Sequence, residues 1–88
     1  MNERIRELAE QATSYADTLD IADQKVYQEI MCREFAELII RECVEQVRGQ
    51  YLPVMEDEEM MKDTLWDGYV QCGVDSVVAI EEHFGVEE

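Results

Sequence analysis

The chain has 88 residues, of which 22 are acidic and 7 are basic, and its formal net charge at pH 7 is −15. Nucleic-acid phosphate and anionic membranes are therefore poor partners, because proteins that bind them need clustered Lys and Arg. Hydrophobic residues make up 47% of the chain, too large a share for a disordered acidic tail. We expect a single acidic helical domain over residues 1–88, with a core of modest size.

Helix-forming residues dominate the composition. One proline and four glycines argue against a turn-rich β fold, so we predict an all-α protein, a small bundle of three main helices. The first helix is expected over residues 2–19, with Asn2 as its N-cap. Its apolar residues recur at steps of three and four, as in an amphipathic helix: Ile5, Leu8, Ala9, Ala12, Tyr15, Ala16 and Leu19.

The second helix is expected over residues 22–48, with Asp20 or Asp23 at its start. Charged side chains of alternating sign follow it at steps of four and finally three, which is typical of a solvated face: Glu29, Arg33, Glu37, Arg41, Glu45 and Arg48. The opposite sector is apolar and unusually wide: Met31, Cys32, Phe35, Ala36, Leu38, Ile39, Ile40, Cys43 and Val47. Such a sector favours neighbours on two sides, so we predict a homodimer or a higher homo-oligomer.

Residues 50–55 are predicted to form a linker, because Gly49 is a typical helix end and Pro53 disfavours continuation. The third helix is expected over residues 56–84. We place an interruption near Gly73, a new start at Asp75 and Ser76, and the end of the helix at Gly85. Its apolar face is predicted from the following residues: Met60, Met61, Leu65, Trp66, Tyr69 and Cys72.

The charge is concentrated in the last third of the chain, where residues 53–88 contain eleven acids and one base, Lys62. Four acids at steps of three or four would share one face of a continuous helix: Glu56, Glu59, Asp63 and Asp67. We expect this face to be exposed and to continue through Glu81 and Glu82. An acidic row without interspersed cations indicates a partner protein with a basic surface.

A cluster of soft and aromatic side chains overlaps this row: Met55, Met60, Met61, Trp66 and Tyr69. It could pack in the core, or it could form a groove for a partner, because Met surfaces adapt to varied ligands and aromatic residues anchor interfaces. Trp66 and Tyr69 therefore join the four acids as the predicted partner-binding residues.

No catalytic, metal-binding or cofactor-binding pattern is found in the sequence. The single histidine, His83, is best explained as a residue that stabilises the C-terminus of its helix, and no H-E-x-x-H or Glu-x-x-His motif is present. The acidic run over residues 56–59 lacks the order of an EF-hand loop, so it is interpreted as a solvated helix start. We expect no enzymatic activity, no cofactor and no bound metal.

The cysteines, Cys32, Cys43 and Cys72, form no C-x-x-C pair. Along one helix Cys32 and Cys43 would lie about 16 Å apart, too far for a disulfide, so we expect reduced and half-buried thiols. The N-terminal residues lack the apolar region of a signal peptide, and no stretch approaches about 18 apolar residues. A cytoplasmic location is expected.

Three stretches of the sequence are similar to one group of proteins: MNERIRELAEQA at residues 1–12, FAELIIREC at residues 35–43 and EHFGVE at residues 82–87. Together, over about a third of the chain, they resemble short proteins encoded by tailed bacteriophages, notably marine and cyanobacterial ones. No active site is known in that group, so the resemblance assigns a role to no residue. It implies a phage accessory protein made in the cytoplasm of a bacterial host.

The sequence is compatible with three functions. The first is a protein that binds and modulates or inhibits a host protein through its acidic surface, as a nucleic-acid mimic or an anti-defence factor. The second is an oligomeric sponge for a host nucleotide signal, which would need Arg4 with Arg6, or Arg33 with Arg41, gathered at an interface. The third is a structural or assembly protein of the phage particle.

Overall fold

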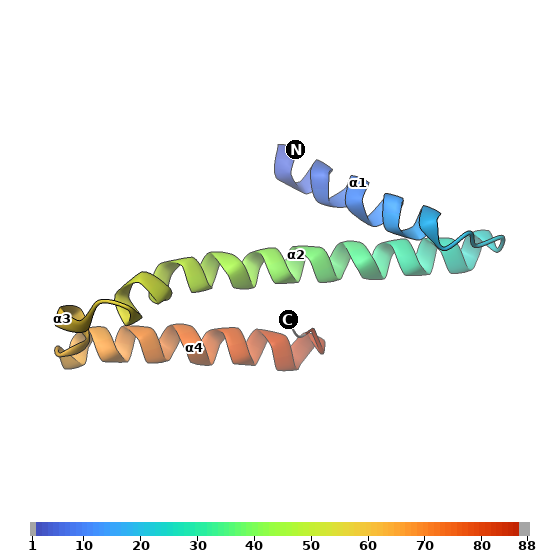
Figure 1. Cartoon of the computed structure of the whole chain (residues 1–88). Coiled ribbons are helices and arrows are strands. Elements are labelled where there is room, and N and C mark those ends of the chain that lie inside the picture. Colours follow the sequence, from blue (N-terminus) through green and yellow to red (C-terminus); the bar gives the residue numbers. More distant parts are fainter. Residues whose placement is uncertain (1, 87–88) are drawn as a thin grey trace. The chain divides into compact units, whose positions relative to one another are not determined.

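The computed structural model describes residues 2–86, and every regular element in that range is an α-helix (Figure 1), which confirms the all-α prediction. There are four helices in it instead of three: α1 (Glu3–Thr18), α2 (Gln24–Met55), α3 (Glu58–Met61) and α4 (Thr64–Phe84). The chain folds into two compact units, unit 1 within residues 1–39 and unit 2 within residues 40–88. Helix α2 contributes its first half to unit 1 and its second half to unit 2. The expectation of one acidic domain stays a prediction.

Unit 1 begins with a capped amphipathic helix, as predicted. The Asn2 side chain accepts a hydrogen bond of 2.7 Å from the Arg4 backbone N–H, which satisfies one of the unpaired donors at the start of α1. Leu8, Ala12 and Ala16 are buried at four-residue steps, so they lie on one face of the helix. The buried face of α1 is therefore formed by one leucine and two alanines.

The turn between α1 and α2 is closed by Asp23. Asp20 adopts a left-handed backbone conformation with φ of 50°, which Asp tolerates better than most residues. Asp23 Oδ1 then accepts hydrogen bonds from the backbone N–H groups of Lys25 at 2.9 Å and Val26 at 3.3 Å. Of the two aspartates predicted to start α2, Asp23 is the N-cap.

Helix α2 continues through Gly49 and Pro53 to Met55, so the predicted end at residue 48 and the linker at 50–55 are wrong. Pro53 lies in the last turns of α2, where its missing N–H removes one helical hydrogen bond, and α2 bends near this end (Figure 1). Tyr51 is only 6% exposed and belongs to the core of unit 2. Burying this ring is worth more than the roughly 1 kcal/mol that a helical glycine costs.

The core of unit 2 joins the second half of α2 to α4 through Val44, Tyr51, Val70 and Val77. At Gly73 a Cβ atom would lie 2.5 Å from Cδ2 of Tyr51, so the tyrosine ring occupies the space that a side chain at position 73 would need. The predicted interruption near Gly73 is therefore wrong. The glycine allows a close approach of two helices within an unbroken α4.

The interruption lies instead between α3 and α4, at Lys62 and Asp63. Asp57 caps α3 by accepting from the N–H groups of Glu59 at 3.0 Å and Met60 at 3.1 Å. Asp63 caps α4 by accepting from the Leu65 N–H at 2.9 Å. Two carboxylate caps six residues apart restart the helix, because each satisfies donors that a continuous helix would pair internally.

The C-terminal end of α4 agrees with the sequence prediction. Gly85 has φ of 66°, a left-handed conformation that glycine adopts without strain, and its N–H group bonds to the Glu81 carbonyl. The Val86 N–H group bonds to the same carbonyl at 3.1 Å, and the Val86 side chain is buried. Asp75 and Ser76 start no new helix. Asp75 accepts from Gln71, and Ser76 donates to the Cys72 carbonyl, both inside α4.

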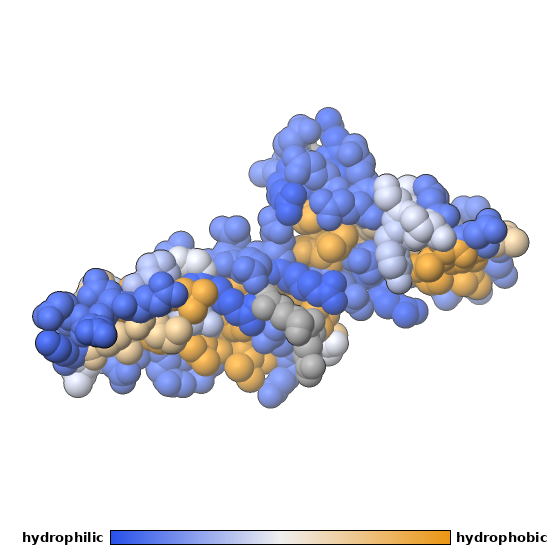
Figure 2. Space-filling model, viewed as in Figure 1, coloured by the Kyte–Doolittle hydropathy of each residue, from blue (hydrophilic) through white to orange (hydrophobic). Residues whose placement is uncertain are grey.

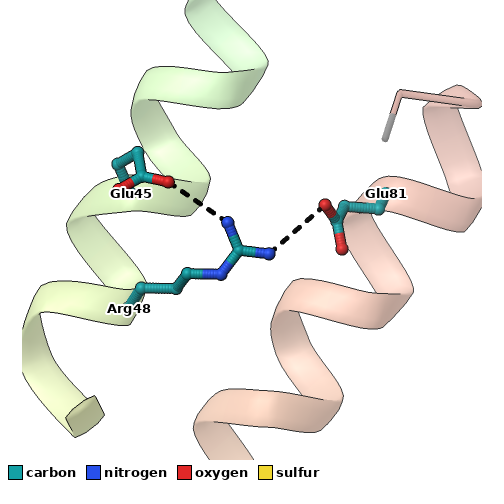
Figure 3. Close-up of polar contacts among 3 residues, drawn as sticks. All are labelled: Glu45, Arg48 and Glu81. Carbon is teal, nitrogen blue, oxygen red and sulfur yellow. Dashed lines mark hydrogen bonds and ion pairs between the residues drawn. The ribbon is translucent and has the colours of Figure 1, made fainter. Parts of the chain in front are cut away.

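Arg48 links α2 to α4 within unit 2 (Figure 3). Its Nη1 lies 3.2 Å from Oε1 of Glu45 on α2, and its Nη2 lies 3.5 Å from Oε2 of Glu81 on α4. The side chains of Arg48 and Glu81 are only 21% and 18% exposed. Arg48 therefore departs from the predicted solvated row, and Glu81 does not belong to the predicted exposed acidic face.

The wide apolar sector of α2 is incompletely buried in both units. Its larger members are half-buried: Met31, Phe35, Leu38, Ile39, Ile40 and Val47. Cys32, Ala36 and Cys43 are exposed. Figure 2 shows apolar side chains at the surface of each unit among hydrophilic ones. The homo-oligomer that this sector suggested stays a prediction.

Candidate partner-binding surface

The segment from Glu56 to Asp67, here called the acidic segment, contains six acids and one base. The four acids predicted as partner-binding residues are exposed: Glu56, Glu59, Asp63 and Asp67. They do not share one helix face, because Glu56 follows α2, Glu59 is in α3, and Asp63 and Asp67 open α4. The prediction of a single row is wrong, since it assumed a continuous helix. The acids instead surround two successive helix starts.

Some of these carboxylates have structural tasks. Asp57 and Asp63 are engaged as N-caps, and Nζ of Lys62 lies 3.1 Å from Oε1 of Glu59 in an exposed ion pair. Such exposed pairs contribute little stability, about 0–1 kcal/mol. The acids that remain for electrostatic attraction without loss of a cap are Glu56, Glu59 and Asp67, with Glu58 beside them.

An exposed apolar patch lies at the start of α4, within the acidic segment and just after it. Leu65 is 72% exposed and Tyr69 is 41% exposed, four residues apart and hence on one side of the helix. The rings of Trp66 and Tyr69 are 5.7 Å apart in an edge-to-face arrangement. An open hollow is lined by residues of this turn alone: Thr64, Leu65, Trp66, Gly68 and Tyr69.

The methionines of the soft and aromatic cluster differ in burial: one supports the interpretation as core, and another supports the interpretation as a partner surface. Met61 packs against the core of unit 2, whereas Met55 is 44% exposed at the end of α2. Trp66 is half-buried and Tyr69 is exposed. The cluster is thus part core and part surface. Leu65, predicted in the apolar face of the helix, is highly exposed instead, and no local sequence signal indicates this.

A second hollow lies beside the first, between α2 and α4 of unit 2. It is lined by Val47, Gln50, Tyr51, Tyr69, Cys72 and Gly73. The Tyr69 hydroxyl donates a long hydrogen bond of 3.4 Å to the Gln50 carbonyl at its edge. Sequence reasoning missed this hollow because it requires α2 to extend past Gly49 and Tyr51 to pack on Gly73. Tyr69 is the residue that the two hollows share.

The other chemistry-bearing residues are dispersed. Cys32, Cys43 and Cys72 are free and exposed rather than half-buried, and His83 lies in the last turn of α4 with its ring 4.8 Å from that of Phe84. Within residues 2–86, no three His, Cys, Asp or Glu side chains come together as a potential metal site. In the same range, no helix has the length and apolarity to cross a membrane.

The chain was compared with protein families, with curated proteins and with solved structures, and none of them matched it.

Proposed function

We propose that this protein is a non-enzymatic phage accessory protein that binds a host protein in the cytoplasm of the bacterial cell and modulates or inhibits it. The partner presents a basic surface that includes at least one apolar side chain. The acidic segment attracts the basic residues, and the Leu65–Trp66–Tyr69 patch receives the apolar one. Mimicry of a nucleic acid and an anti-defence role are the forms of inhibition that this chemistry suits best.

The position of the apolar patch among the acids is the observation that supports the proposal most. Scattered acids alone would meet a need for solubility, but a 72% exposed leucine beside a tryptophan and a tyrosine does not. Aromatic anchors supply much of the binding energy at interfaces, whereas peripheral charges mainly raise the association rate. Binding of this kind becomes weaker and slower as salt concentration rises, because salt screens the charges.

The nucleotide sponge receives less support. On α1, Arg4 lies 2.9 Å from Glu7 and Arg6 lies 3.9 Å from Glu3, so both candidate cations are next to acids of their own helix. Arg33 and Arg41 fall in different units. With these neighbouring acids, Arg4 and Arg6 present no concentrated positive site for phosphate. For an assembly protein of the phage particle, no feature of residues 2–86 gives particular support.

A synthetic amphipathic helical peptide with a Lys face and a Leu face is a suitable probe for the first test. Trp66 is the only tryptophan of the chain, so its fluorescence reports directly from the proposed surface. We expect saturable binding with a shift of the Trp66 emission, and an affinity that falls at least tenfold between about 50 mM and 300 mM salt. A peptide of equal charge with Ser in place of Leu should bind more weakly and leave the emission unchanged.

Charge variants can localise the surface without disturbing the caps. Glu56→Gln, Glu59→Gln and Asp67→Asn remove three charges from the acidic segment and leave Asp57 and Asp63 in place. The matched control removes three charges from exposed positions of unit 1: Glu10→Gln, Asp20→Asn and Glu29→Gln. The first triple variant should reduce affinity about tenfold more than the control. Equal losses in both would show that net charge alone attracts the peptide, and the proposed surface would be wrong.

A further inference from the structure

Helix α4 has a second row of residues, on a side that does not pack in the core of unit 2. Its core-facing residues include Val70 and Val77. A separate set at steps of four, three, four and three runs along another side, and each member is exposed: Leu65, Tyr69, Cys72, Ser76 and Ala79. This spacing is the 3.5-residue period at which two helices pack along a seam. None of the five is charged, in a chain whose net charge is −15. We call these residues the α4 seam.

The seam has large residues at one end and small ones at the other. The large side chains, Leu65 and Tyr69, stand at its N-terminal end, and the small ones, Ser76 and Ala79, stand at its C-terminal end. A second copy of α4 running antiparallel about a two-fold axis at Cys72 would place Leu65 against Ala79 and Tyr69 against Ser76. On both sides of Cys72 a large residue would then face a small one, so the interface is self-complementary and can pack without large voids.

The acids beside the seam favour the same orientation. On α4, Asp75 and Glu82 flank one side of the stripe. In the antiparallel register, helix geometry places Asp75 near Gly68 and Gln71 of the second copy, and Glu82 near its Thr64. A parallel arrangement would instead bring the acidic segments of the two chains together at the same end of the helix pair, where their like charges repel. The antiparallel macrodipoles of the two helices are also mutually favourable.

We infer that the α4 seam is the contact of a homodimer with two antiparallel α4 helices and Cys72 at the two-fold axis. From Leu65 to Ala79 the seam is about 21 Å long, at 1.5 Å rise per residue. A single helix pair of this length buries less than the roughly 800 Å² per partner of a standard stable interface. The dimer is therefore a weak one, formed at micromolar or higher concentration. Repulsion between two acidic chains opposes it at low salt and is screened at high salt.

This dimer is independent of the proposed function, although Leu65 and Tyr69 belong to both surfaces. A bound basic partner and a second copy would compete for these two side chains. The two events respond to salt in opposite directions, since partner binding weakens and dimerisation strengthens as salt rises. Failure of one can therefore be distinguished from failure of the other.

Sedimentation of the whole protein at rising concentration tests the dimer. We expect the mass to rise from one chain towards two, with a larger dimer fraction at about 500 mM than at about 50 mM salt. Ala79→Glu places a charge against Leu65 of the second copy and should weaken the dimer at least tenfold. Val78→Glu adds the same charge at a neighbouring exposed position off the seam and should change the dimer less than threefold. Circular dichroism of both variants checks that α4 is folded.

Oxidative cross-linking tests the register. A thiol oxidant such as diamide removes two electrons from two Cys72 thiols and should join them in a disulfide between two chains. We expect this product from the wild type and from Cys32→Ser with Cys43→Ser, and its loss in Cys72→Ser. A monomer at all concentrations and salts, a dimer that survives Ala79→Glu, or cross-linking through Cys43 at the rate of Cys72 would each overturn the inference.

Discussion

The two units bury their helices by different means. In unit 1 the fully covered side chains on α1 are Leu8, Ala12 and Ala16, two of which are methyl groups. In unit 2 an aromatic ring, Tyr51, sits against a glycine backbone and is surrounded by valines. An alanine face allows a close approach of two helices, but its short side chains do little to fix one register. A ring above a glycine fixes one register, because any displacement brings the ring against a Cβ atom.

We therefore expect that adding a single methyl group destabilises the core of unit 2 more than the core of unit 1. Gly73→Ala should give the largest effect, because its methyl group needs the space of the Tyr51 ring. Overpacking costs about 1–3 kcal/mol, and about 1 kcal/mol is regained from the higher helix propensity of alanine. We expect a net loss of up to about 2 kcal/mol in the free energy of unfolding, measured by urea denaturation.

Gly68→Ala is the control for this effect. Nothing lies within 4 Å of a Cβ atom at Gly68, so the same change in α4 should stabilise the protein by about 1 kcal/mol. Amide hydrogen exchange locates the effect of Gly73→Ala. Protection should fall in α4 and the second half of α2 and stay unchanged in α1. An equal fall in α1 would show that the two units unfold together.

A loss of stability of intermediate size is expected from substitutions of Asp63, at the break between α3 and α4. Asp63→Ala removes the acceptor of the Leu65 N–H group and should cost about 1 kcal/mol. Asp63→Asn removes the same charge but keeps a capping oxygen, so its cost should stay below about 0.5 kcal/mol. Thermal unfolding of the two variants distinguishes the contribution of the capping hydrogen bond to stability from that of the Asp63 charge. Equal costs would mean that Asp63 acts through its charge rather than its hydrogen bond.

The smallest effect is expected in unit 1, where the Tyr27 hydroxyl donates a hydrogen bond of 2.6 Å to Oδ1 of Asp17. This bond, with lesser contributions from desolvation and from the Asp17 charge, raises the pKa of Tyr27 above its ordinary value. Its stabilisation is thus fully present below the ordinary pKa of tyrosine, and it disappears as the pH rises through the raised pKa. Asp17→Asn should lower the pKa of Tyr27 towards the ordinary value, as measured by NMR titration of the ring. An unchanged pKa would contradict this assignment.

Much of the fold followed from local sequence features. The periodicity of α1, the cap at Asn2 and the left-handed end at Gly85 involve residues a few positions apart, and the structure confirms them. The end of α2 could not be predicted in the same way. Its extension depends on Tyr51 meeting Gly73, two residues far apart in the sequence, and each looks like part of a helix break when considered alone.

The candidate surface was predicted only in part. Exposure of the four acids followed from their charge, but their arrangement did not. Asp63 was counted as one charge in a row, although an aspartate followed by Thr64 and an apolar residue is also an N-cap signal. The α4 seam was missed because Leu65, Tyr69 and Cys72 were assigned to the same face as Trp66. Only the packing of α4 in unit 2 separates the two stripes.

The fit of Tyr51 against Gly73 also has an evolutionary consequence. Positions 51 and 73 are coupled, because a side chain at 73 becomes acceptable once the ring at 51 is replaced by something smaller. Related chains should therefore vary at the two positions together: an aromatic residue at 51 with glycine at 73, or a small aliphatic residue at 51 with alanine or serine at 73. A lineage can pass from one pair to the other most easily by shrinking position 51 first, since that order leaves a cavity rather than a clash.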